Sequence, residues 1–361
     1  MTVTDRTVTD RTTRVRTAPR GYLVIGRTVA IPMRRASVVA GAGLFVLLLA
    51  AAVTTLTWGR LGIDLADLPA ALLGDAEGKD RFVFNRLRGP RLTVAIGVGA
   101  ALGLSGALFQ SVTRNPLGSP DVIGLSAGAG AGAAFCALMF PGTVPVPVGA
   151  LIGAILAMAL VYVSTGTGFR NPARLVIAGI GVAAMGAAVT QYVVYALERD
   201  KASVLTAYVN GSLTARSWTD ATTVWLVLLA ATLPAALISR RLDIGEMGDD
   251  IAEGLGSEPK KAKTLAVLLA IALSAAAVSV SGPIAFIALT APQIAKRLTR
   301  SSSGPHLLLS ALTGGLLLVL ADLCSQQLAL FDDLPVGIYT MAIGGAYLGY
   351  LLVREWRKGV L

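Results

Sequence analysis

The sequence predicts an all-α integral membrane protein of about ten transmembrane helices, with both termini in the cytoplasm. Hydrophobic residues make up 54% of its 361 residues and charged residues only 14%, whereas soluble domains carry about 25% charged residues. Its 40 glycines are typical of membrane helices, because small residues let two helices approach closely. A soluble enzyme of this length would need a polar surface that this composition cannot supply, so that class is excluded.

The apolar segments follow one another from residue 36 to residue 353. Most of them have the ~17–25 residues that a helix needs to cross a hydrocarbon core. The segment from 122 to 169 is too long for one span, and Pro141, Pro145 and Pro147 divide it into two. In chain order the segments are Ala36–Gly59, Leu92–Thr113, Val122–Phe169, Leu175–Leu197, Ala221–Ser239, Thr264–Ala295, His306–Leu328 and Leu334–Val353.

The number of spans depends on whether Thr264–Ala295 turns back at Ser281-Gly-Pro283. The positive-inside rule decides, because cytoplasmic loops carry an excess of Lys and Arg. Ten spans with a cytoplasmic N-terminus place most of the 31 Lys and Arg residues inside. Nine spans divide them almost equally between the two sides. The charge pattern therefore predicts ten spans and a break at this Gly-Pro pair.

Three regions are predicted along the chain. Residues 1–35 are basic, begin with a repeated Thr-Val-Thr-Asp-Arg and are expected to form a disordered cytoplasmic arm against the anionic inner leaflet. Residues 36–355 form the transmembrane domain, and 356–361 a cytoplasmic tail. The net charge of +10 lies at the ends of apolar segments, not on one face with interleaved aromatic residues. This distribution argues against nucleic-acid binding.

Ionisable residues are nearly absent from the middle of the predicted spans. Asp322 is the only acidic residue well inside an apolar segment, near its outer end and beside Gln326 and Gln327. A transporter driven by a proton or sodium gradient generally places such residues at mid-membrane, where the coupling ion binds. A secondary transporter driven by an ion gradient is the alternative function class, and this pattern disfavours it.

No group of residues predicts a catalytic, cofactor or metal site. His306 is the single histidine, and Cys136 and Cys324 lie far apart in apolar segments, where free cysteine acts as a small apolar residue. Gly74–Asp80 lacks the spacing of a phosphate-binding loop. We therefore expect no enzyme activity in this chain, and any ATP that drives it is hydrolysed by another chain.

The longest predicted cytoplasmic loop, Arg240–Lys263, has the pattern of a docking surface. Its acidic residues alternate with Met247, Ile251 and Leu255 at helical spacing. Glycines at 254 and 256 can end that helix, and Ser257 can cap a second helix that begins near residue 259. The pattern predicts two short helices that contact a cytoplasmic partner; a solvated charged linker is the alternative.

Several strings of the sequence resemble the FecCD/BtuC-type permeases of iron-siderophore and vitamin B12 ABC importers. The likeness runs through residues 36–355 and leaves out the basic arm. The strings that carry it are Arg88–Leu92, Gly99–Gln110, Arg114–Ser126, Met247–Gly256, Gly282–Pro292 and Leu334–Gly337. Three of them look most like catecholate, ferric-enterobactin permeases: Asn115–Asp121, Glu246–Asp250 and Ala321–Leu328.

The resemblance implies a type II ABC importer permease in the cytoplasmic membrane. A second permease subunit, identical or homologous, would complete the path. Two cytoplasmic ATPase subunits would bind ATP and Mg²⁺, and an extracytoplasmic binding protein would deliver the ferric siderophore. Vitamin B12, haem or a hydroxamate siderophore is the alternative cargo.

The resemblance also assigns roles to matching residues. Arg88 and Arg91 would bind acidic residues of the binding protein, although Gly89 stands where the family has leucine and Gln326 where some relatives have a third arginine. The residues that would couple to the ATPase are Glu246, Met247, Gly248, Asp249, Asp250, Ile251, Gly254, Leu255 and Gly256. Those that would close the cytoplasmic gate are Asn115, Pro116, Leu117, Asn171, Pro172 and Ala173.

Two further expectations concern the interior. The path for a bulky ferric siderophore is expected to be wide and to bind its cargo weakly, with small or amide side chains such as Ser105, Gln110, Ser126 and Gln191 as candidates for its lining. The Gly-x3-Gly pairs are expected to be helix-packing contacts. These pairs are 99/103, 128/132 and 345/349.

Overall fold

The computed structural model describes residues 22–25, 31–59, 61–121, 123–166, 172–197, 205–206, 208–299, 304–328 and 334–357. Apart from one short hairpin, the regular elements among these residues are helices, which confirms the predicted fold class. In chain order they are β1 (Tyr22–Ile25), β2 (Ile31–Arg34), α1 (Arg35–Thr57), α2 (Leu68–Leu73), α3 (Gly78–Phe82), the π-helical turn η1 (Val83–Arg88), α4 (Gly89–Thr113), α5 (Leu125–Met139), α6 (Val146–Ser164), α7 (Pro172–Ala196), α9 (Trp218–Gly245), α10 (Asp249–Gly254), α11 (Pro259–Ser281), α12 (Ile287–Leu298), α13 (Leu307–Gln327) and α14 (Val336–Arg357).

The predicted disordered arm, residues 1–35, contains the hairpin. Its strands β1 and β2 pair antiparallel, with Tyr22 opposite Arg34 and Ile25 opposite Ile31. Helix α1 begins at the next residue, Arg35. The rest of the arm, 1–21 and 26–30, lies outside the described residues, as does the tail beyond Arg357.

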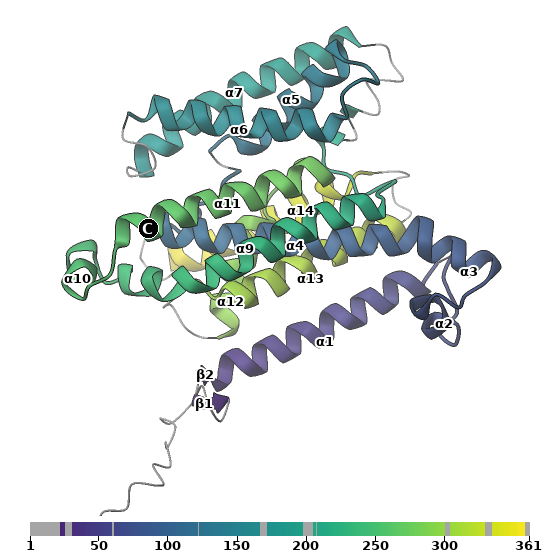
Figure 1. The fold of residues 1–361 in the computed structure, drawn as a ribbon, viewed down its shortest axis with the longest axis horizontal. Helices are drawn as coiled ribbons and strands as arrows, with labels where there is room; N and C mark the ends of the chain where they lie inside the picture. Colours follow the sequence, from purple (N-terminus) through teal and green to yellow (C-terminus); the bar gives the residue numbers. More distant parts are fainter. Residues whose placement is uncertain are drawn as a thin grey trace, which may run out of the picture.

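Helix α4 lies at the centre of the molecule. In Figure 1 it occupies the middle layer with α9, α11 and α13, and α5, α6 and α7 form a separate layer to one side. Along the continuous helical stretch Gly78–Thr113, 83% of the most apolar window is buried, compared with 17% for α1. Helices α9, α11, α12 and α13 all pack against α4. This burial explains why α4 is rich in glycine and alanine, whereas α1 exposes large apolar side chains.

Two of the three predicted Gly-x3-Gly pairs are close helix contacts. A Cβ atom on Gly99 or Gly103 would clash with the backbone of Gly314 or Ser310 on α13, and the glycines at 128 and 132 face α6 in the same way. The third pair is a correction, because a Cβ atom on Gly345 or Gly349 of α14 would meet no other atom of the described residues within 4 Å. Helix α14 instead makes its close approach at Gly344, against the ring of Phe286.

The chain breaks between α11 and α12, as the Gly-Pro pair predicts. Gly282 adopts a φ of +71° and Phe286 a φ of +67°, which end one helix and start the next. The hydroxyl of Tyr208 donates to the carbonyls of Val278 and Ser279 at 3.0 Å each. The carbonyl of Val278 also accepts from the backbone N–H of Gly282 at 2.8 Å, whereas the carbonyl of Ser279 lies in the last turn of α11, where carbonyl groups lack helical partners.

The helices run between two ends of the molecule. Helix α10 lies at one end and α2 and α3 lie at the other (Figure 1); we call them the α10 end and the α3 end. Seven described helices are long and apolar enough to cross a membrane. Helix α5 has 15 residues and α12 has 12, which is short for a full span. The count of ten spans and the cytoplasmic position of the termini stay predictions.

Candidate functional site

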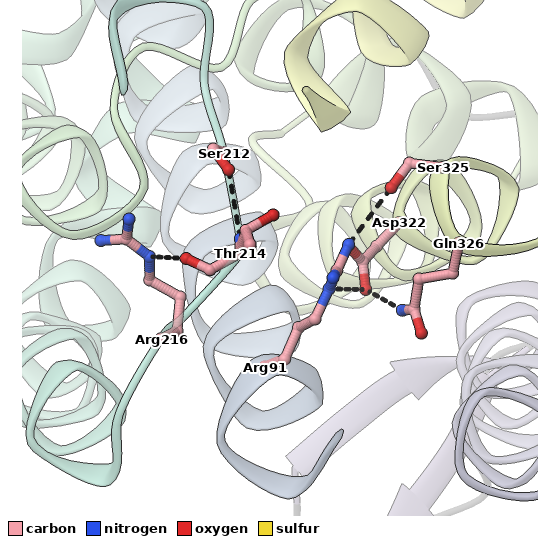
Figure 2. Close-up of polar contacts among 7 residues, drawn as sticks. All are labelled: Arg91, Ser212, Thr214, Arg216, Asp322, Ser325 and Gln326. Atoms are coloured by element: carbon pink, nitrogen blue, oxygen red, sulfur yellow. Dashed lines mark hydrogen bonds and ion pairs between the residues drawn. The ribbon is translucent and has the colours of Figure 1, made fainter. Parts of the chain in front are cut away.

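An ion pair joins α4 to α13 at the α3 end. The guanidinium of Arg91 forms a fork on the carboxylate of Asp322, with Nε 2.9 Å and Nη2 2.7 Å from Oδ1 (Figure 2). The side chain of Asp322 is 1% exposed and that of Arg91 is 21% exposed. Such two-point, charge-assisted bonds are among the strongest that side chains make. Asp322, the acidic residue predicted well inside an apolar segment, is therefore a structural partner of Arg91, a predicted docking residue.

Two more polar side chains complete this cluster. Gln326 donates from Nε2 to Asp322 Oδ2 at 2.7 Å, and Arg91 donates from Nη2 to Ser325 Oγ at 3.2 Å. Figure 2 shows all four side chains converging from α4 and α13. Gln326 thus contacts the same carboxylate as Arg91. We call Arg91, Asp322, Ser325 and Gln326 the Arg91 cluster.

Arg88 is buried and points toward α1. Its Nη1 donates to the carbonyl of Thr55 at 2.5 Å and to that of Trp58 at 2.6 Å. Gln327 donates to the same Trp58 carbonyl at 3.2 Å. Carbonyls at a helix C-terminus lack helical partners and attract cations. Arg88 therefore has a structural role that its sequence context did not predict, and its docking to another protein stays a prediction.

A third arginine at this end was missed in the sequence. Arg216 donates from Nη1 to the carbonyl of Val280 near the end of α11, at 2.5 Å, and from Nε to the carbonyl of Thr214 at 3.2 Å (Figure 2). A cation near a helix C-terminus is favourable for the same electrostatic reason. The sequence offers one signal for Arg216, its position next to Ser217, which caps α9. Its partner Val280 is remote in the sequence and could not be predicted.

The α10 end carries the predicted coupling residues. Met247, Ile251 and Leu255 are all largely exposed, and we call these three the coupling surface. Gly248 precedes α10 with a φ of +120°, and Asp250 is exposed. An exposed apolar surface of this kind is typical of a contact with another protein.

The carboxylate of Asp249 joins α10 to two other elements. Oδ1 lies 2.6 Å from Arg114 Nη2, and Oδ2 lies 2.6 Å from Lys263 Nζ. Arg114 follows the last residue of α4, and Lys263 is on α11. The hydrogen bond from Lys263 lowers the pKa of Asp249, and both cations lower it further by charge. The group is therefore ionised at neutral pH.

The prediction of two short coupling helices is wrong in its second part. Helix α10 ends at Gly254, and Gly256 has a φ of +75°, as expected for a helix terminus. The next helix, however, continues without interruption from Pro259 to Ser281 as α11. Its N-cap is Glu258, not Ser257. Pro259 favours the first turn of any helix, so sequence signals could mark the start of α11 but not its length.

The first predicted gate loop is a tight turn beside this network. Asn115 Oδ1 accepts from the backbone N–H of Leu117 at 2.9 Å, and Asn115, Pro116 and Leu117 are all exposed. The second predicted gate loop is described only in part. Asn171 lies outside the described residues, and Pro172 and Ala173 begin α7 without a description of their side chains.

Asp121 follows the first gate loop by four residues, and its carboxyl group is buried. Ser126 donates to Oδ1 at 2.5 Å, and Oδ2 has no hydrogen-bond partner among the described residues. Burial raises the pKa of this carboxyl to about 6, although the bond from Ser126 opposes the rise. The sequence around Asp121 predicts no role for this residue, because burial of a loop residue has no sequence signal.

The candidate path residues divide into buried and exposed groups. Ser105 is fully buried and donates to the carbonyl of Ala270 at 2.7 Å, and Gln110 donates to that of Leu289 at 3.1 Å. Ser126 holds Asp121, whereas Gln191 is exposed on α7. Three of the four candidates are thus engaged inside the fold. Among the described residues, no group of three or more His, Cys, Asp or Glu residues is arranged to hold a metal ion.

The comparisons with known proteins agree with this architecture. Residues 47–354 match the FecCD transport family. The chain is 39% identical to the ferric enterobactin transport system permease protein FepG of Escherichia coli, over 86% of this chain and 96% of that protein. It is 34% identical to the achromobactin permease CbrC of Dickeya dadantii, over 86% and 89% of the two chains. It is also 34% identical to the Fe(3+)-citrate permease YfmE of Bacillus subtilis, over 87% and 96%.

A solved structure shows the same fold. An inward-facing metal-chelate type ABC transporter superposes with a TM-score of 0.76 at 24% sequence identity, over 87% of this chain and 98% of that one. The family match covers more than three-quarters of the sequence and includes both the Arg91 cluster and the coupling surface. This multi-pass membrane protein belongs to the FecCD transport family.

Proposed function

We propose that this chain is the permease subunit of an ABC importer that carries a ferric siderophore of the catecholate type across the cytoplasmic membrane. The observation that carries the proposal is the 39% identity to a ferric enterobactin permease over nearly the whole of both chains. The achromobactin and Fe(3+)-citrate permeases are similar at lower identity. Transport of an iron complex is the shared activity, and the catecholate is the more specific part of the proposal.

The working complex contains several chains. A second permease subunit, a copy or a homologue, encloses the path with this one. Two cytoplasmic ATPase subunits bind the coupling surfaces and hydrolyse ATP with Mg²⁺, and an extracytoplasmic binding protein delivers the cargo. This chain has no catalytic residue and no cofactor of its own. In this proposal the chain crosses the membrane ten times, with both termini and α10 in the cytoplasm and the Arg91 cluster on the opposite side of the membrane.

The exposed apolar residues of α10 support docking of the ATPase. Burial of Met247, Ile251 and Leu255 in a partner groove removes apolar surface from water, which favours association. Movement of the ATPase then displaces α10 and the gate loops Asn115–Leu117 and Asn171–Ala173. The path itself binds the cargo weakly, so that release into the cytoplasm is not slowed.

Docking of the binding protein is proposed at Arg88 and Arg91. Because both arginines have partners within the chain, an acidic residue of the binding protein reaches only the part of Arg91 that Asp322 leaves exposed. Charge reversal of both arginines is expected to weaken this docking while ATPase association persists. Unchanged docking of purified binding protein at low salt would remove the assignment.

Uptake of radioactive iron tests the function. Cells with and without this gene receive the iron complex of a catecholate or of a hydroxamate siderophore, each in the presence and absence of an uncoupler. Loss of catecholate uptake alone supports the proposal. Loss of hydroxamate uptake alone keeps the importer and changes its cargo, whereas uptake that collapses with the uncoupler while ATP is maintained indicates an ion-driven transporter.

A further inference from the structure

The end of α4 has an unusual backbone conformation for its residue type. Arg114 caps the helix with a φ of +50°, a left-handed conformation that usually belongs to glycine or asparagine at this position. Its side chain explains why an arginine is present. Nη2 donates to the carbonyl of Gly245 at the end of α9, at 2.5 Å, and to Asp249 of α10 at 2.6 Å. One guanidinium thus joins the ends of α4, α9 and α10.

The same arginine directly precedes the first gate loop. Asn115 follows it in the chain, and the loop turns on the bond between Asn115 Oδ1 and the N–H of Leu117. The backbone of Gly118 also donates to the carbonyl of Asn115 at 3.0 Å. These bonds make the loop a compact unit that begins at the residue held by α10. A displacement of Arg114 therefore moves this turn as a whole.

Helix α10 depends on Asp249 for its position. Six residues are too few to form a stable isolated helix, so α10 is held by its contacts with neighbours. The carboxylate of Asp249 lies in its first turn, where negative charge is also favoured by the helix dipole. It binds Arg114 on one side and Lys263 on the other. The residues of the coupling surface lie on both sides of Asp249 in the sequence: Met247 precedes it, and Ile251 and Leu255 follow it.

We propose that the Arg114–Asp249 ion pair is the positioning link that moves the gate loop Asn115–Leu117 when a partner displaces the coupling surface. This inference rests on the proposed function and adds to it the residues that carry the movement. A second ion pair provides a contrast. Lys260 Nζ lies 3.4 Å from Glu253 Oε1, so it joins α10 to α11 but makes no contact with the gate loop.

The experiment follows the gate loop without cargo. Cys136 and Cys324 are replaced by alanine, and Leu117→Cys is introduced as the probe position. The permease is reconstituted with its ATPase partner, and the rate of maleimide labelling is measured with and without ATP. We expect ATP to change this rate about fivefold or more, as coupling energies between sites commonly do.

Three variants test the link. Arg114→Gln and Asp249→Asn are expected to reduce the ATP response to less than about twofold. In Arg114→Gln, which changes none of the predicted coupling residues, the ATPase is expected to copurify with the permease as before. Arg114→Lys retains a cation for Asp249 and is expected to recover part of the response. Lys260→Gln is the matched control, because it removes an ion pair between α10 and α11 and should leave the response intact.

Other results overturn the inference in distinguishable ways. A full ATP response in Arg114→Gln, or an equal loss in Lys260→Gln, shows that the pair is not the link. Loss of ATPase copurification in Asp249→Asn alone shows that this residue docks the partner directly. If ATP does not change the labelling rate in the protein with an intact ion pair, the gate loop does not move and the inference fails. If no ATPase partner associates with the wild-type chain, the proposed function fails together with the inference.

Discussion

The two ends of the molecule use arginine–aspartate pairs in opposite environments. At the α3 end, Asp322 is 1% exposed and Arg91 is 21% exposed, and Gln326 completes the hydrogen bonds of the carboxylate. At the α10 end, the side chains of Arg114 and Asp249 are 44% and 46% exposed. A buried pair is strongly destabilising to break, because one charge is left without a partner. An exposed pair contributes little to stability and can exchange partners.

This difference matches what each end has to do. The Arg91 cluster holds α4 and α13 together along the most buried helix of the fold, so its geometry is set by the surrounding packing. The Arg114–Asp249 pair joins the exposed end of α4 to α10, a helix of six residues. Low local stability is expected where segments move during function. The buried pair therefore suits a static joint, and the exposed pair suits a movable one.

The largest expected effect comes from breaking the buried pair. Asp322→Ala leaves the guanidinium of Arg91 without its carboxylate and is expected to lower the free energy of unfolding by about 3 kcal/mol. Thermal unfolding of the purified protein in detergent measures the change. Ser325→Ala is the control, because it removes only the 3.2 Å bond from Arg91. Equal stability of Asp322→Ala and the wild type would show that the pair is not a structural joint.

An intermediate effect on stability is expected at Asp121, an acidic residue that follows the first gate loop in the chain and has a buried carboxyl group. Its pKa is raised to about 6 by burial, so the folded protein favours the protonated carboxyl, and stability is lost as the pH rises through about 6. Asp121→Asn removes this cost and should stabilise the protein at pH 8 by about 1–3 kcal/mol. The gain should shrink as the pH falls toward 5.

The pH dependence of the difference in melting temperature between Asp121→Asn and the wild type measures this effect. Ser126→Ala serves as the control for loss of the hydrogen bond alone. A stabilisation that does not change between pH 5 and pH 8 would contradict titration of this carboxyl as the cause. The result decides whether burial of the Asp121 carboxyl causes the pH dependence of stability.

The smallest expected effect on stability is at the exposed pair. Asp249→Asn should change the free energy of unfolding by less than about 1 kcal/mol, and added salt should reduce even that difference. The same detergent unfolding assay, repeated at low and high ionic strength, gives the comparison with Asp322→Ala. A destabilisation as large as that of Asp322→Ala would remove the contrast between a static and a movable joint.

Much of the candidate site could be predicted from residue patterns. The exposed apolar residues Met247, Ile251 and Leu255 follow from helical spacing between glycines, and the break after Ser281 follows from Gly-Pro. Arg88 and Arg91 lie at the start of α4, where the apolar segment begins. Their partners could not be predicted, since Asp322 is 231 positions from Arg91 in the sequence. No local pattern distinguishes an arginine that faces a binding protein from one that caps α1.

The sequence by itself determined the class of molecule, the helices and their breaks, because these depend on composition, apolar segment length and local backbone preferences. It also determined two of the three glycine contacts. Only the tertiary structure decided that Gly345 and Gly349 lack a close helix contact among the described residues, that α11 is one long helix from Pro259, and that Asp249 holds Arg114. Each of these depends on which distant surfaces meet, and helix packing sets those contacts through shape and burial summed over many residues.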